Sequence, residues 1–263
     1  MVSFVSLFSG SDKNSSVFSY KNTNIMIDCG GSFKLLKEQL EKVNLSFSDI
    51  DAILITHSHS DHIKALPMII KNTDIPIYAS LGTHEEIFDM QYLMPKNSRI
   101  VIFESRPFSI KDIDISCFKT PHDTNFSLGY NFLFNKKSAT FATDLGHISD
   151  NVINNVNGKD FVFLESNHDI DMLKNSGRPL NIIKRILGDN GHLSNELSAS
   201  FSLSLAKKGL KRLMLGHLSG EANTPELAYS VTKNLFLKNG IKTEKDIYLD
   251  VAKRGILSNV VKF

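Results

Sequence analysis

The sequence predicts an α/β protein with one domain over residues 1–263, with helices outside and β-sheets inside. Short apolar or alternating runs typical of strands recur along the chain, separated by stretches with helical apolar spacing. No low-complexity linker or internal repeat interrupts this pattern. The hydrophobic fraction of 41% is ordinary for a globular protein with a sizeable core.

Strands are expected where a short apolar or alternating run is bounded by turn-forming residues. The run 50–56 is nearly all apolar, as in a strand buried on both faces. Residues 21–24 separate two runs and predict a hairpin, and the segment 257–263 is expected to close a sheet edge. In chain order, the expected strands are 2–8, 17–20, 25–28, 50–56, 75–79, 100–103, 113–120, 128–134, 139–143, 161–164, 213–215 and 247–251.

Helices are expected where apolar residues recur every three or four positions. In the first helix, which begins at about Ser32, Phe33, Leu36, Leu40 and Val43 share one face. The other helices are expected over residues 63–70, 82–90, 179–187, 195–207 and 225–238.

Composition excludes several classes of protein. No run approaches the roughly 20 apolar residues that span a bilayer, and the N-terminus lacks the features of a signal peptide. The two cysteines, Cys29 and Cys117, form no CxxC pair, so a cytoplasmic protein without membrane contact is expected. A net charge of +2 does not by itself indicate a nucleic-acid binder. Nothing in the sequence predicts the oligomeric state.

The most informative motif is the run His57-Ser58-His59-Ser60-Asp61-His62, which follows the apolar run 50–56. In an extended segment, residues i and i+2 point the same way, so His57 and His59 can hold one cation. A turn at Ser60 can present Asp61 and His62 to a neighbouring cation. The spacing therefore predicts a pair of divalent metal ions.

Four further polar residues stand where an expected strand ends. They are Asp28, His122, Asp144 and His217. Loops after buried strands commonly carry binding and catalytic groups on a rigid scaffold. Their shared position beside the histidine motif favours a functional role for all four.

With these residues, nearly the whole chain resembles the metallo-β-lactamase superfamily. The resemblance implies an αββα sandwich with metals at one edge. It also implies that His57, His59 and His122 hold one ion, that Asp61, His62 and His217 hold the other, and that Asp144 bridges them. Asp28 would support the histidine loop from behind without touching the metal.

The nitrogen and oxygen ligands without thiolate suit zinc or manganese. A water between the two ions would lose a proton near neutral pH and attack the substrate, with Asp61 among the catalytic residues. An aspartate at position 144, where class B β-lactamases carry cysteine, argues against a lactamase. His59 stands where the di-iron flavoproteins of the superfamily carry glutamate, which argues against a redox role.

Finer motifs resemble the WalJ (YycJ) family of bacterial exonucleases, which is related to tRNase Z. They include the segments 7–15, 164–169, 184–187, 191–195 and 215–219. By this resemblance His192 protonates the leaving group or orients the phosphate, and Glu165 holds its ring. His147 and His168 are candidate substrate contacts, each with a structural role as the alternative. His84 is expected to be a surface or capping residue.

The predicted function is a two-metal phosphodiester hydrolase, a 5′→3′ exonuclease with DNA as its substrate. One alternative is a phosphodiesterase for small cyclic nucleotides or for RNA ends, since substrates of these kinds need the same metal site. Another is a metal-dependent binding module without turnover. That module is expected to have degenerate ligands, and none of the seven ligand positions is degenerate.

Overall fold

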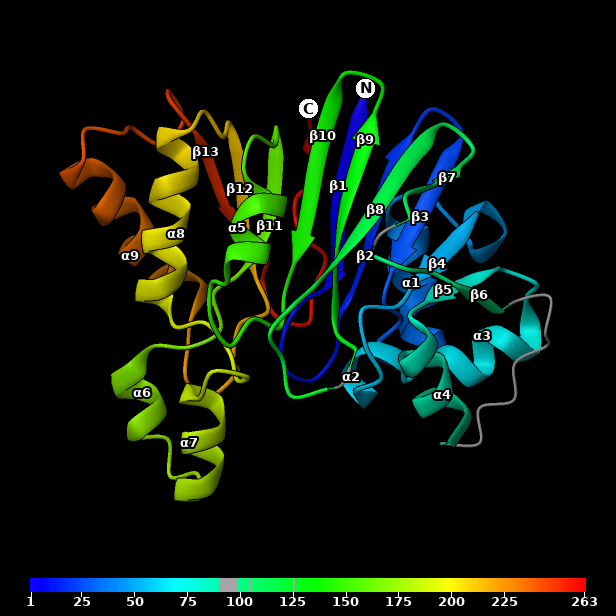
Figure 1. Ribbon diagram of the computed structural model, residues 1–263, viewed down its shortest axis with the longest axis horizontal. Coiled ribbons are helices and arrows are strands. Elements are labelled where there is room, and N and C mark those ends of the chain that lie inside the picture. The colour runs from blue at the N-terminus through cyan, green and yellow to red at the C-terminus, as the bar shows by residue number, and fades with distance from the viewer. Residues whose placement is uncertain (90–98, 105, 125) are drawn as a thin grey trace.

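Two seven-stranded β-sheets face each other in the computed structural model of the protein, which describes residues 1–89, 99–104, 106–124 and 126–263 (Figure 1). The first sheet has the order β14-β1-β2-β3-β4-β5-β6, and its strands β3 to β6 are parallel. Its strands are β1 (Val2–Phe8), β2 (Ser15–Tyr20), β3 (Thr23–Ile27), β4 (Ala52–Leu54), β5 (Ile77–Ala79), β6 (Arg99–Val101) and β14 (Val261–Lys262).

The second sheet has the order β13-β12-β11-β10-β9-β8-β7, and its strands β10 to β13 are parallel. Its strands are β7 (Phe108–Ile110), β8 (Ile113–Lys119), β9 (Leu128–Phe134), β10 (Lys137–Ala142), β11 (Phe161–Glu165), β12 (Arg212–Gly216) and β13 (Tyr248–Val251). Strand β14 pairs with β1 and closes an edge of the first sheet, as expected for the C-terminal segment.

Helices cover the outer faces of both sheets, which confirms the predicted four-layer αββα sandwich (Figure 1). Helices α1 (Phe33–Lys42), α3 (Leu66–Asn72) and α4 (Leu81–Asp89) lie on the first sheet, with a 3-10 turn at Phe47–Asp49. Helices α5 (Asp150–Val156), α8 (Asn195–Lys207) and α9 (Pro225–Lys238) lie on the second. The short helix α2 (Ser60–Ile63) lies below the strands near the centre of the view, and α6 (Ile170–Lys174) and α7 (Leu180–Leu187) project from the body at the lower left.

The three interfaces between the layers are apolar. Between the sheets, aromatic rings of both sheets meet, with the ring centroids of Phe4 and Phe161 5.0 Å apart and those of Phe18 and Phe132 4.5 Å apart. Aromatic pairs of this kind stabilise a core beyond what the burial of their surface area contributes. The two outer interfaces pack helices against the other face of each sheet. This rigid sandwich holds the loops at its edge.

Several predicted elements agree closely with the structure. The strands 2–8 and 128–134 and the helices 195–207 and 225–238 have the predicted bounds. The first helix begins where expected, and the Ser32 side chain caps α1 by accepting a hydrogen bond from the Leu35 amide. The two cysteines are free and buried.

Other predictions differ from the structure. The single helix expected over 63–70 is two short helices, α2 and α3, and α2 begins inside the histidine motif at Ser60. Strand β7 and helices α5 and α6 were not predicted, because none has more than seven residues in which to show a period. Residue 90, the expected end of α4, lies outside the described residues.

The prediction that His84 lies on the surface is wrong. Its side chain is buried, and its Nε2 atom is 3.0 Å from the carbonyl oxygen of Ile100. The residue stands on the face of α4 that packs against β6. The sequence Gly82-Thr83-His84 resembles a helix start, and only the packing of α4 shows which way the ring points.

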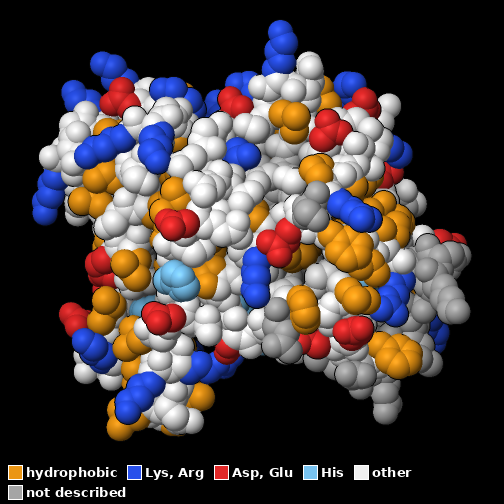
Figure 2. Space-filling model, viewed as in Figure 1, with side chains coloured by type: hydrophobic (Ala, Val, Ile, Leu, Met, Phe, Trp, Pro, Cys, Tyr) orange, Lys and Arg blue, Asp and Glu red, His pale blue; other side chains and the backbone are white. Residues whose placement is uncertain are grey.

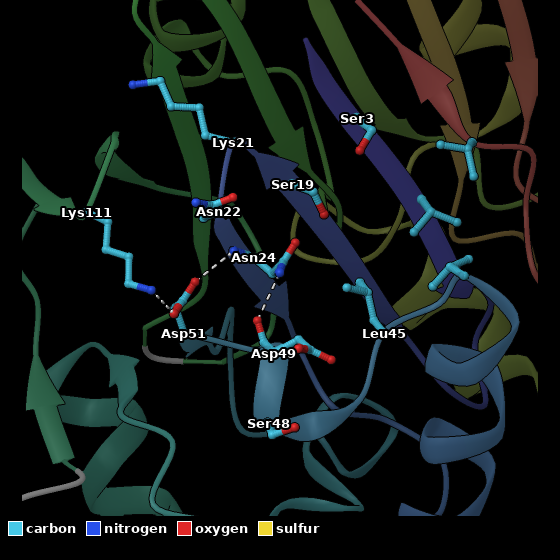
Figure 3. A pocket seen from close by; sticks show the side chains of 13 residues that line it. Ser3, Ser19, Lys21, Asn22, Asn24, Leu45, Ser48, Asp49, Asp51 and Lys111 are labelled. Carbon is cyan, nitrogen blue, oxygen red and sulfur yellow. Dashed lines mark hydrogen bonds and ion pairs between the residues drawn. The ribbon is translucent and has the colours of Figure 1, made fainter.

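A polar pocket of about 530 Å³ lies at the opposite end of β3 from Asp28 (Figure 3). Lys111 pairs with Asp51, and Asn24 hydrogen-bonds to Asp51 and to the carbonyl of Asp49. These polar groups are therefore satisfied by one another. No helix in the described ranges is long and apolar enough to cross a membrane.

Candidate metal centre

The expected site residues lie at one edge of the sandwich, where strands of both sheets end. Strand β8 runs in the same direction as β10, because both are antiparallel to β9. The carboxyl ends of strands that run together meet at one edge. The residues beyond these ends are Asp28 after β3, His57 after β4, His122 after β8, Asp144 after β10 and His217 after β12.

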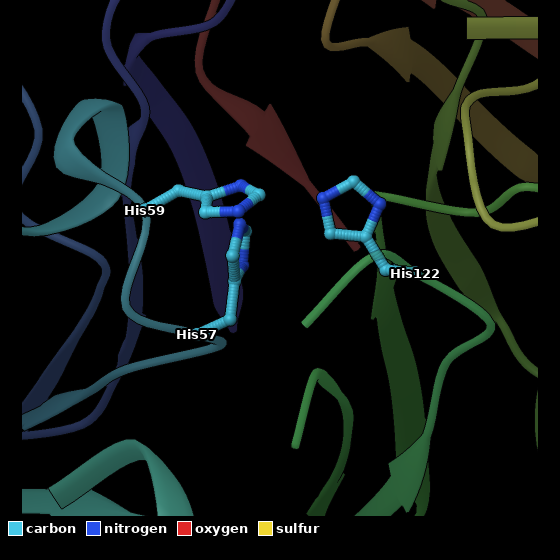
Figure 4. Close-up of side chains that lie close together, drawn as sticks. All are labelled: His57, His59 and His122. Atoms are coloured by element: carbon cyan, nitrogen blue, oxygen red, sulfur yellow. The ribbon is translucent and has the colours of Figure 1, made fainter. Parts of the chain in front are cut away.

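Three histidines form the first group of ligand atoms. His57 and His59 come from the loop after β4 and face His122 from the loop after β8 (Figure 4). The ring centroid of His57 is 4.6 Å from that of His59 and 5.0 Å from that of His122. Within the described chain, the Nε2 atoms of His57 and His122 are buried without a hydrogen-bond partner. Unpartnered nitrogens that converge in this way fit a cation.

The second group consists of Asp61, His62 and His217, whose ligand atoms lie within 4.8 Å of one another. Asp144 stands between the two groups. Its Oδ1 atom is 3.5 Å from Nε2 of both His122 and His217, and its Oδ2 atom is 3.6 Å from Nε2 of His62. All seven expected side chains therefore come together, and their nitrogen and oxygen atoms suit divalent metal ions.

Asp28 supports the histidine loop and lies behind the ligand atoms. Its buried carboxylate accepts hydrogen bonds from the amide and hydroxyl of Thr56, and its Oδ2 atom is 2.8 Å from Nδ1 of His62. A carboxylate only accepts, so Nδ1 of His62 carries a proton and donates it. The Nε2 atom of His62, which faces Asp144, is then left with its lone pair for a metal.

We expect Asp28→Asn to weaken metal binding about 10- to 100-fold. An asparagine NH2 group facing His62 favours the ring tautomer with its proton on Nε2, the nitrogen that faces Asp144. Competition with a chromophoric chelator measures the change in affinity. Asp112→Asn, which breaks an exposed ion pair with Lys21, is the matched control and should leave the affinity unchanged. Equal affinities for wild type and Asp28→Asn would contradict this role.

Glu165, the last residue of β11, connects two histidines. Its Oε1 atom is 2.7 Å from Nδ1 of His217 and 2.8 Å from Nδ1 of His192, and its Oε2 atom accepts the amides of Leu145 and Leu193. Both histidines therefore donate from Nδ1. The carboxylate holds the His192 ring as expected and also orients His217, which the sequence did not indicate.

The remaining two candidate histidines lie in different surroundings. His168 is buried, and neither ring nitrogen has a partner among the described residues. Burial lowers its pKa to about 4, so the ring is neutral. His147 is exposed, and its Nδ1 atom is 2.8 Å from the carbonyl oxygen of Asp189. His147 can thus meet a substrate directly, whereas His168 is shielded from solvent.

The loop after β1 contributes contacts that the sequence did not predict. The Asn14 side chain donates to Asp61 and lies 3.1 Å from Nε2 of His62, while its Oδ1 atom accepts the amide of Gly10. A Cβ atom on Gly30 would stand 1.8 Å from the carbonyl oxygen of Asp61, so glycine there permits the close approach of the two loops. Asn14 lies in the segment 7–15 that resembles the WalJ family, but the sequence does not indicate its contact with Asp61.

Three site residues have left-handed backbone conformations, with φ of 57° at Asp28, 58° at Asp144 and 57° at His217. Such conformations cost residues other than glycine about 1–3 kcal/mol and concentrate at functional sites. At each of the three, the backbone turns sharply at a strand end and aims the side chain into the site.

In the metal-free protein the two histidine groups differ in protonation. Burial lowers the pKa of His57, His59 and His122, so these rings are neutral at neutral pH. Burial also opposes charge on His217, but Asp144 and Glu165 outweigh it and raise the pKa of His217 to about 9. Asp61, Asp28 and Asp144 likewise raise the pKa of His62.

The two metal ions should therefore bind with different pH dependence. Below about pH 9, a cation entering the group that contains His217 must displace a proton, whereas one at His57, His59 and His122 displaces none. The affinity for the cation in the group that contains His217 should rise about tenfold per pH unit from roughly pH 7 to 9 for each proton released. Calorimetry in buffers of different ionisation enthalpy counts those protons. The same proton release for both ions would contradict the expectation.

Residues 23–218 match the family described as "Beta-lactamase superfamily domain". This match spans most of the chain and includes the seven ligand positions. The protein belongs to the metallo-β-lactamase superfamily, whose fold together with the histidine and aspartate clusters implies divalent metal ions.

Two bacterial exonucleases are similar along most of the chain. Exodeoxyribonuclease WalJ of Streptococcus pneumoniae is 35% identical over 230 residues, covering 87% of this chain and 86% of WalJ. Exodeoxyribonuclease YycJ of Bacillus anthracis is 31% identical over 225 residues, covering 86% and 85%. Within the superfamily, the chain therefore belongs with the WalJ and YycJ proteins, as a metal-dependent hydrolase of the nuclease and phosphodiesterase type.

Solved structures agree on the fold. The metallo-β-lactamase-fold protein YhfI of Bacillus subtilis has a TM-score of 0.72 at 17% identity, covering 98% of this chain and 99% of YhfI. The short form of human tRNase Z has a TM-score of 0.65 at 17% identity, covering 98% of each chain.

Proposed function

We propose that the protein is a two-metal 5′→3′ exonuclease that hydrolyses DNA. The observation that carries the proposal is the convergence of seven ligand side chains beside the Glu165–His192 pair. The named activity of the WalJ and YycJ relatives supports DNA as the substrate. Two free, buried cysteines suit the reducing cytoplasm, where DNA is found in bacteria.

His57, His59 and His122 would hold one ion, and Asp61, His62 and His217 the other, with Asp144 shared between them. Zinc and manganese both suit this ligand set. When bound, the two ions supply an activated water and offset the negative charge that grows on the phosphate. The protein's own part is to fix a proton on Nδ1 of each ring, which Asp28 does for His62 and Glu165 for His217, so that Nε2 is the nitrogen turned toward the metal position.

His192 is the group that would protonate the leaving oxygen. Its Nδ1 proton is held by Glu165, which leaves Nε2 as the atom that can deliver a proton. The ring centroid is 5.1 Å from that of His122 and 5.3 Å from that of His217, and the side chain is 19% exposed. His192 thus stands beside both ligand groups with access to solvent. His147, and His168 after rearrangement, would be further contacts to the substrate.

The test uses protein loaded with zinc or with manganese. Substrates are duplex DNA labelled at one 5′ end, single-stranded DNA, RNA and a chromogenic phosphodiester. Stepwise release of nucleotides from the 5′ end of DNA is the expected result. Cleavage of RNA or of the small ester with DNA left intact would overturn the choice of substrate, and cleavage by fully metal-depleted protein would overturn the metal mechanism.

A further inference from the structure

Arg185 lies at the candidate metal centre although it belongs to neither ligand group. The residue is in the last turn of α7, one of the two helices that project beside the site (Figure 1). Its Nε atom donates a hydrogen bond to Oδ2 of Asp123, the residue after His122. The other oxygen of the same carboxylate is 3.3 Å from Nε2 of His122 and 3.7 Å from Nε2 of His59. One carboxylate therefore links the guanidinium to the atoms that face the first metal position.

The exposed fractions of these side chains show the open side of the site. Those of His122 and Asp144 are 1% and 2%, whereas those of His59, Asp123 and Arg185 are 33%, 24% and 54%. Arg185 therefore lies with His59 and Asp123 on the solvent-exposed side of the buried ligands. The hydrogen bond to Asp123 raises the pKa of Arg185, and the charge of Asp61 in the second ligand group adds to the effect. The guanidinium is thus within electrostatic reach of both groups.

The guanidinium has donors to spare. Only its Nε–H has a partner within the described ranges and the side chain is 54% exposed, so the two terminal NH2 groups are available to a ligand. Two such groups match two oxygens of a phosphate, and Arg forms this two-pronged contact more readily than Lys. The two ligand groups consist of histidines and carboxylates, and carboxylates repel an anionic substrate.

We infer that Arg185 binds the non-bridging oxygens of the phosphodiester through its terminal NH2 groups, and that Asp123 positions it. The inference rests on the proposed function in one respect, that the substrate is a phosphodiester. Lys184 and Lys174 are exposed on the same two helices, and Figure 2 shows Lys and Arg side chains on this lobe at the lower left. The lobe formed by α6 and α7 thus carries exposed basic side chains in addition to Arg185, beside exposed acidic ones such as Asp171.

A purely structural role for Arg185, as an anchor of α7, makes a different prediction. The chain contains a matched pair at the other end of this helix, where Nε of Arg178 donates to Glu221 over 2.8 Å. That pair ties α7 to the loop after His217 and involves none of the ligand histidines. Arg178→Gln therefore removes an equivalent anchor without removing the group at the mouth of the site.

The test compares metal-loaded wild type, Arg185→Gln, Arg185→Lys and Arg178→Gln. Binding of a fluorescent single-stranded oligonucleotide with cleavage-resistant phosphorothioate linkages is measured by anisotropy at several salt concentrations. Arg185→Gln should raise Kd at least about tenfold, since hydrogen bonds to charged groups are among the strong ones. It should also lower the slope of log Kd against log salt by about 0.7, the loss of one phosphate contact. The Kd of Arg185→Lys should lie between those of wild type and Arg185→Gln. The Kd of Arg178→Gln should stay within about twofold of that of wild type.

The same variants are assayed with the chromogenic phosphodiester, where Arg185→Gln should raise KM. If KM for the small ester rises in Arg185→Gln but the wild type does not bind DNA, the assignment of DNA as the substrate is overturned and the role of Arg185 in binding phosphate is kept. Unchanged Kd, salt slope and KM in Arg185→Gln would overturn the inference. An equal loss of affinity in Arg178→Gln would also overturn it, because it would indicate that both arginines act only by anchoring α7. Metal content and thermal unfolding, measured for each variant, show that the comparison is between folded, loaded proteins.

Discussion

Substitution of Asp144 by alanine is expected to lower the rate of phosphodiester hydrolysis at least about 10³-fold, or about 4 kcal/mol of activation free energy. Asp144 is the one side chain among the described ligand groups whose two oxygens reach histidines of both groups. Its loss removes a shared ligand and leaves the Nε2 atoms of His62, His122 and His217 without their common carboxylate. Steady-state rates with labelled DNA and elemental analysis of bound metal measure the two consequences.

Asp144→Asn is the companion variant, because asparagine tolerates the left-handed conformation at this position better than alanine does. It keeps the shape of the side chain and loses its charge, so the severe loss of rate should persist in a folded protein. Asp150→Ala, an exposed position in the first turn of α5, serves as a control and should have wild-type activity. Activity within about tenfold of wild type in both Asp144 variants would show that Asp144 is not an essential ligand.

The second large effect is expected for Glu165→Gln, with a fall in kcat of about 100-fold and a loss of stability. Oε1 of Glu165 serves two imidazoles and Oε2 serves two backbone amides, so all four partners are donors. Whichever way the glutamine amide is turned, its NH2 group faces two donors, each costing about 1–3 kcal/mol if left unsatisfied. Rates, metal content and urea unfolding measure the effect.

His192→Ala separates the two tasks of Glu165. Loss of the proton donor alone should lower the rate on DNA about 10²- to 10⁴-fold with metal content unchanged. A chromogenic aryl ester has a leaving group that departs without a proton, so it should be affected far less. Glu165→Gln also misorients His217 and should slow both substrates. If His192→Ala slowed DNA and aryl ester equally, His192 would not be the proton donor.

Much of the fold could be predicted, because its signals are local. Helices α8 and α9 have 13 and 14 residues, enough to show a helical period, and the mostly apolar strand β9 is bounded by turns. Helices α2 and α6, with four and five residues, are shorter than the pattern that would reveal them. The burial of His84 could not be predicted either, because it depends on how α4 packs against β6.

The site was predictable to the extent that its residues follow strands. Asp28, His122, Asp144 and His217 each stand beyond a strand end, and parallel strands bring such ends to one edge. Asp123 and Asn14 carry no comparable signal. The first adjoins a ligand and the second lies in a turn, and each acquires its contact from a partner distant in the chain, Arg185 and Asp61 respectively.

The sequence by itself determined the kind of chemistry. The motif from His57 to His62 places four ligand side chains within six residues, and this spacing follows from chain geometry alone. Only the tertiary structure decided which nitrogen of each ring faces the metal positions and where the open side lies. Those depend on contacts such as Glu165 with His217 and Asp123 with Arg185, which join residues 52 and 62 positions apart. Such contacts are set by strand register and helix packing, because hydrogen bonds form only over a few ångströms and no local pattern encodes a distance between remote segments.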